Sequence, residues 1–125
     1  MNSKFYISLE AARLLKEKGY DIPCIAYYQN DEFRPYAFSR YKLSISDTNA
    51  APSYMNQYSA PTKSEAIDWL ESKGIVVWVE PTIDGWLYFM KSEQHYEDNA
   101  EPIFGKFQTR LAAEEAAIIK ALELL

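Results

Sequence analysis

The side chains best suited to nucleophilic chemistry are the only cysteine and the only histidine of this chain. Cys24 could attack as a thiolate if His95 took its proton. However, Cys24 lies in the apolar run 22–26, while His95 lies in a polar segment. A thiol among apolar neighbours usually behaves as a small hydrophobic side chain. We therefore predict no catalytic residue from this pair.

An acidic segment, 91–102, holds the side chains that could bind a divalent ion. They are Glu93, His95, Glu97, Asp98 and Glu101. The glycine and the ligand spacing of an EF-hand loop are missing. We expect a solvated loop without a metal.

The four glycines all have local structural uses. Gly19 and Gly74 follow helical stretches, Gly85 belongs to a turn signal, and Gly105 precedes the last helix. Neither G-x-G-x-x-G nor G-x-x-x-x-G-K-[ST] occurs, so we predict no nucleotide or other cofactor. No pair of carboxylates stands out for acid–base work. A small enzyme with a carboxylate site is therefore the least favoured hypothesis.

One predicted strand carries basic and aromatic residues on the same face. Its alternate positions are Arg34, Tyr36, Phe38, Arg40 and Lys42. Aromatic rings stack on bases and cations hold phosphates, so this face could bind single-stranded nucleic acid or a protein partner. Alternatively, the two aromatic rings face the core and the charged side chains lie at its rim.

Charge is divided unevenly along the chain, whose net charge is −5. Residues 1–62 have seven Lys or Arg against six Asp or Glu, a balance of +1. Residues 63–125 have six against twelve, a balance of −6. The second half should repel phosphate backbones and could bind a basic protein surface. The alternative is an ordinary solubilising surface.

Length and composition indicate one globular domain, residues 1–125. The chain is 48% hydrophobic and 25% charged, which suffices for a core without disulfides. The N-terminus lacks the apolar stretch of a secretory signal, and no segment has about 18 consecutive apolar residues. A lone cysteine fits a reducing compartment. We expect a cytoplasmic protein without a membrane contact.

Three helices are predicted from apolar spacing and capping residues, over 9–18, 63–73 and 110–124. Ser8 and Thr109 are suitable N-caps, and Thr62 with Glu65 forms a capping box. An apolar stripe on the last helix lies along Leu111, Ile118, Ala121, Leu122 and Leu125.

Two hairpins are predicted between the helices. Residues 75–80 and 86–90 flank Asp84-Gly85, and both faces of this pair are apolar, so one could face helices and the other a partner. Residues 22–28 and 33–41 flank a turn at 29–32, with Pro35 placing its strand at an edge. Segment 43–60 lacks periodicity, which is typical of a functional or disordered loop or of a loop with an unrecognised short strand.

These elements predict an α+β fold of order α-β-β-α-β-β-α, with a mainly antiparallel sheet and helices packed on a face. An αββ internal repeat over 8–42 and 62–91 would explain why residues 10–19 and 65–74, 55 positions apart, match at five of ten positions. The alternative is that any amphipathic helix ending in glycine gives such a match.

Several strings resemble small phage and prophage proteins of gut bacteria whose function is not known. They are residues 7–21, residues 58–62 with Trp69-Leu70, residues 85–88 and the helix with Glu114-Glu115-Ala116. The resemblance implies a mobile-element setting and no mechanism. We therefore expect a non-enzymatic accessory protein that binds a protein partner or itself. A nucleic-acid-binding module using residues 34–42 is the alternative.

Overall fold

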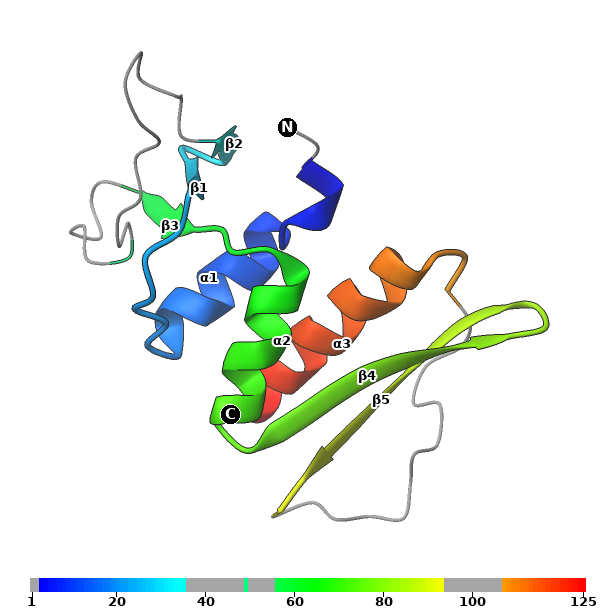
Figure 1. Ribbon diagram of the computed structural model, residues 1–125. Coiled ribbons are helices and arrows are strands. Elements are labelled where there is room, and N and C mark those ends of the chain that lie inside the picture. The colour runs from blue at the N-terminus through cyan, green and yellow to red at the C-terminus, as the bar shows by residue number, and fades with distance from the viewer. Residues whose placement is uncertain (1–2, 36–48, 50–55, 94–106) are drawn as a thin grey trace. The chain divides into compact units, whose positions relative to one another are not determined.

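Figure 1 shows a computed structural model of the chain, which describes residues 3–35, 49, 56–93 and 107–125. The described part has an α+β fold, with three α-helices and five strands in two small antiparallel sheets against which helices pack. The internal contacts group the chain into two compact units, Met1–Thr62 and Lys63–Leu125. These units are the same two sets of residues whose charges were counted above, so the first unit has a net charge of +1 and the second a net charge of −6.

The first unit begins with a short 3₁₀ helix, η1, followed by helix α1 and three strands. Their bounds are Ser3–Phe5 for η1, Leu9–Glu17 for α1, Ala26–Gln29 for β1, Glu32–Pro35 for β2 and Gln57–Ser59 for β3. The prediction of α1 is confirmed, because Ser8 Oγ accepts a hydrogen bond from Ala11 N at 3.2 Å. Beyond the helix, Gly19 has φ +91°, a left-handed conformation that glycine adopts without strain.

The sheet of the first unit has the order β2-β1-β3, with both pairings antiparallel. Pro35 lies in the edge strand β2, as predicted. Strand β1 begins at Ala26, four residues later than expected, because Ile22 and Pro23 are exposed and a proline has no N–H to donate to a ladder. Strand β3 lies within the segment that showed no periodicity.

The second unit contains α2, Lys63–Ser72, the hairpin of β4, Ile75–Thr82, with β5, Gly85–Ser92, and α3, Arg110–Leu124. Helix α3 packs on both strands and on α2, which also packs on β4 (Figure 1). Thr109 Oγ1 caps α3 by accepting from Ala112 N at 3.1 Å. All three elements were predicted, and the strands extend beyond the predicted ranges.

The core of α3 differs in part from the predicted stripe. Ile118, Ala121 and Leu122 are buried as expected, but Leu125 is exposed and Leu111 is only partly buried. The buried face is completed by small residues, Ala113 and Ala117. Small side chains allow the helix backbone to approach its neighbours closely, so large residues at the helix ends are not required for packing.

Candidate interaction surface

Of the basic and aromatic strand predicted over 34–42, the structure describes Arg34. It lies in β2 beside Tyr27 of β1, and its guanidinium contacts the Glu32 carboxylate at 3.0 Å. Both partners are largely exposed, so this ion pair contributes little to stability. The other four predicted residues, Tyr36, Phe38, Arg40 and Lys42, lie outside the described residues.

A second group of cations and an aromatic ring lies on the first unit. Arg13 and Lys16 of α1 lie over the ring of Tyr58 in β3, at 5.7 and 5.1 Å from its centroid. Arg13 also contacts Asp31 at 2.6 Å, and Lys16 Nζ donates to the carbonyl oxygen of Gln57 at 3.0 Å. These contacts stabilise the packing of the helix on the sheet. The sequence alone does not reveal this group, because Tyr58 lies more than 40 residues from Arg13 and Lys16.

The candidate nucleophile is enclosed in the first unit. Cys24 is buried, with its Sγ 3.4 Å from the carbonyl oxygen of Ile22 and 3.7 Å from the hydroxyl of Tyr20. His95 lies outside the described residues, as do Glu97, Asp98 and Glu101 of the acidic segment. Within the ranges that are described, no three His, Cys, Asp or Glu side chains come together as metal ligands.

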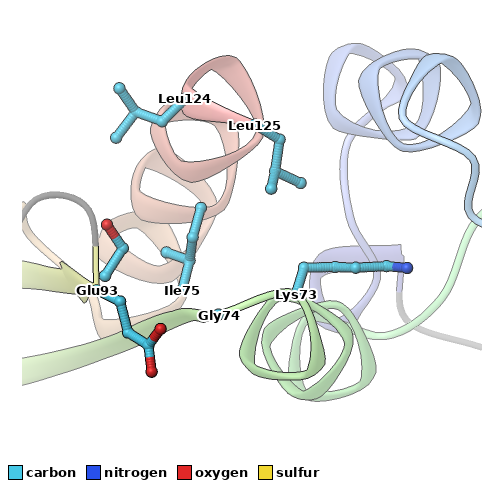
Figure 2. A pocket seen from close by; sticks show the side chains of 7 residues that line it. Lys73, Gly74, Ile75, Glu93, Leu124 and Leu125 are labelled. Carbon is cyan, nitrogen blue, oxygen red and sulfur yellow. The ribbon is translucent and has the colours of Figure 1, made fainter.

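A pocket of about 290 Å³ lies in the second unit where α3 ends near the open end of the hairpin (Figure 2). Figure 2 shows Lys73 and Glu93 pointing away from Leu124 and Leu125. The Lys73 ammonium instead lies over the ring of Trp69, 5.4 Å from its centroid. Ligand and active sites need polar groups that converge, and the two charged side chains that line this pocket do not converge in it.

An open groove of about 360 Å³ lies between α3 and β5. Its lining residues are Tyr88, Phe107, Ala116, Ile119, Lys120 and Glu123. The rings of Tyr88 and Phe107 are tilted, with centroids 5.9 Å apart. Burial, and secondarily the carboxylate of Glu123, raises the pKa of the Tyr88 hydroxyl. That hydroxyl therefore keeps its proton and can donate a hydrogen bond but cannot act as a base near neutral pH.

In addition to the exposed Glu93 and Glu123, the second unit has two groups of exposed carboxylates. Glu65, Asp68 and Glu71 of α2 are exposed and three residues apart, so they lie along one side of the helix and form what we name the α2 acidic stripe. The other group lies at the hairpin tip, residues 80–86, where Glu80 and Asp84 are exposed.

Three cations of the second unit contact groups of the same unit, and one of them is buried. Lys63 is buried and its ammonium lies 3.7 Å from Glu115 of α3. Arg110 contacts Glu114 at 3.1 Å, one turn further along α3. Lys73 lies over its tryptophan, but it is exposed, as are Arg110 and Lys91. Among the described residues of this unit, seven carboxylate side chains are exposed against these three cations, so its outward field is negative.

The β4–β5 hairpin has one covered face and one partly exposed face. The covered face contains Ile75, Val77 and Tyr88, all buried. The opposite face carries Val76, which is 40% exposed, and the stacked rings of Trp78 and Phe89. The prediction that both faces are apolar agrees with this arrangement.

Backbone hydrogen bonds explain why the hairpin tolerates a proline. Trp86 and Phe107 exchange both N–H to carbonyl bonds at 2.8 Å, so the polar backbone groups of Trp86 point away from β4. Pro81 is opposite Trp86 and likewise turns its nitrogen outward. The missing N–H therefore removes no bond from the ladder.

Fold and surface together define the chain as a two-unit α+β protein with an acidic second unit. No protein-family model, curated protein or solved structure matches it. Among the described residues, no helix is long and apolar enough to cross a membrane.

Proposed function

We propose that this protein is a non-enzymatic accessory protein that binds a basic protein partner through its second unit. The observation that supports this proposal is the excess of exposed carboxylates in the unit. Its described residues expose seven carboxylates, five of them on the α2 acidic stripe and the hairpin tip, against three cations, while Lys63 is buried against Glu115. A surface of one sign speeds encounter with an oppositely charged protein and disfavours other partners.

The same charge disfavours self-association through this unit. Two copies would each bring a net charge of −6 to the contact, and like charges facing each other weaken association.

The resemblance to phage and prophage proteins favours a partner in the host cytoplasm, and the single thiol of Cys24 fits such a reducing compartment. The αββ repeat of residues 8–42 and 62–91 is part of this proposal and explains why each unit has a helix followed by a hairpin.

The test compares two variants that each remove three negative charges. One neutralises the stripe by Glu65→Gln, Asp68→Asn and Glu71→Gln. The control makes the matching changes in the first unit, at the exposed residues 10, 17 and 21. A partner captured from host lysate is identified, purified and titrated by calorimetry at 50 and 300 mM NaCl.

We expect the stripe variant to raise the Kd and to reduce its dependence on salt, since fewer charges contribute to the interaction. The control should bind as the wild type does. Equal Kd values for the two variants, or wild-type binding that does not change with salt, would contradict the proposal.

A nucleic-acid-binding module is the second candidate. The position of Arg34 beside Tyr27 on one face of the sheet favours it, since a cation next to an aromatic ring suits a single strand. A fluorescence titration with short oligonucleotides at low salt tests this candidate. No change in Kd on Arg34→Ala would exclude this face as the binding surface.

A further inference from the structure

The most exposed apolar side chain of the described residues lies at the end of the β4–β5 hairpin. Thr82 pairs with Gly85, so Ile83 and Asp84 form a two-residue loop. Ile83 is 100% exposed. Figure 1 shows this tip at the far end of the hairpin, beyond the helices α2 and α3 of the same unit. The isoleucine therefore buries no surface within its own fold.

Turn formation does not explain an isoleucine at this position. The favoured two-residue hairpin turns have positive φ at one or both loop residues, as Asn30 and Asp31 do in the first unit with φ 50° and 68°. Ile83 and Asp84 do not have positive φ. A turn with negative φ accepts most residues, so it neither requires nor disfavours an isoleucine. The fold therefore gains nothing specific from this apolar side chain, which is left available to a partner.

We propose that Ile83 is an anchor that inserts into an apolar pocket of a basic protein partner. The carboxylates of Glu80, three residues before it, and of Asp84, the next residue, are exposed and would contact Lys or Arg side chains at the rim of that pocket. This inference rests on the proposed function, because it assigns the hairpin tip to the same partner. The flanking negative charges disfavour an anionic membrane and a second copy of this acidic unit as occupants.

The test uses Ile83→Asn, with Ile22→Asn in the first unit as the matched control, because Ile22 is also exposed, at 44%. Neither change alters the core, so both variants should unfold at the wild-type temperature. A photo-crosslinking amino acid at position 83, and separately at position 22, then identifies what each site contacts in host cells. The captured partner is purified and its Kd measured for both asparagine variants.

We expect a crosslink from position 83 to apolar residues of a basic protein, and a roughly ten- to hundredfold higher Kd for Ile83→Asn, the loss expected when a buried apolar side chain is removed. The control should leave the Kd unchanged. The inference is overturned if position 83 gives no crosslink, if it links two copies of this chain, or if Ile83 is needed for binding to phosphatidylglycerol vesicles. An unchanged Kd for Ile83→Asn, with a raised Kd for the stripe variant, overturns the anchor alone. If neither variant raises the Kd, both proposals fail.

Discussion

The buried ion pair between Lys63 and Glu115 gives the sharpest prediction about stability. Replacing either residue alone by methionine keeps the side-chain volume and the helix propensity but leaves the other charge in the interior. Replacing both removes the two charges together. The side chains of Lys63 and Glu115 are only 9% and 19% exposed, so water can solvate an unpaired charge only partly.

The expected magnitude follows from the distance and the burial. At 3.7 Å and an effective dielectric constant of about 20, the attraction is about 4.5 kcal/mol. Each single change loses this attraction and leaves a buried charge, so we expect the free energy of unfolding to fall by about 3 kcal/mol. The double change should lie within about 1 kcal/mol of the wild type, because neither desolvation cost remains.

Urea unfolding followed by tryptophan fluorescence measures this effect. All three tryptophans, Trp69, Trp78 and Trp86, belong to the second unit, so their emission reports on the unit that contains the ion pair. Arg110→Met is the control, since the Arg110 side chain is 60% exposed in its pair with Glu114 and its loss should cost less than about 1 kcal/mol. Additive single and double effects, or single effects as small as the control, would refute the reasoning.

Three further predictions follow from single contacts. Tyr28→Phe should lower the free energy of unfolding by about 1–3 kcal/mol, because the buried Tyr28 hydroxyl donates a hydrogen bond to the carbonyl oxygen of Ile7 at 2.7 Å. Urea unfolding followed by circular dichroism measures this loss, which should be smaller for the control Tyr27→Phe because Tyr27 is less buried. Gly74→Ala should lower the free energy of unfolding by about 1 kcal/mol, because alanine is strained at the φ of +92° that Gly74 adopts. An added Cβ would meet no atom within 4 Å, so the backbone strain is the whole effect, and an unchanged melting temperature would contradict this account. The pKa of Tyr88 is raised in the folded state, so the contribution of this residue to stability is complete below pH 10 and is lost as the pH rises above 10. The free energy of unfolding, measured at pH 9 and pH 11, should fall in the wild type and should fall less in Tyr88→Phe.

Local signals in the sequence predicted the helices and both hairpins. Ser8 and Thr109 accept hydrogen bonds at helix starts, and Gly19 and Gly74 adopt the left-handed conformations that end helices. These features depend on residues within about four positions of each other, so they can be inferred from sequence alone. The edge position of Pro35 was predictable for the same reason, because a proline lacks the N–H that an inner strand needs.

The charge of the second unit could also be counted from the sequence, but which charges face outward could not. That depends on tertiary contacts such as Lys63 meeting Glu115 more than 50 residues later. In the same way, strand β3 is defined by its pairing with β1, since three residues carry too little periodicity to predict a strand.

Sequence by itself thus determined the three α-helices, the two hairpins and the charge of each unit, because these are properties of neighbouring residues or of counts. Only the tertiary structure decided which carboxylates remain at the surface and that Ile83 lies fully exposed at a hairpin tip. Exposure is set by what packs against a side chain, and those contacts join residues that are distant in the chain.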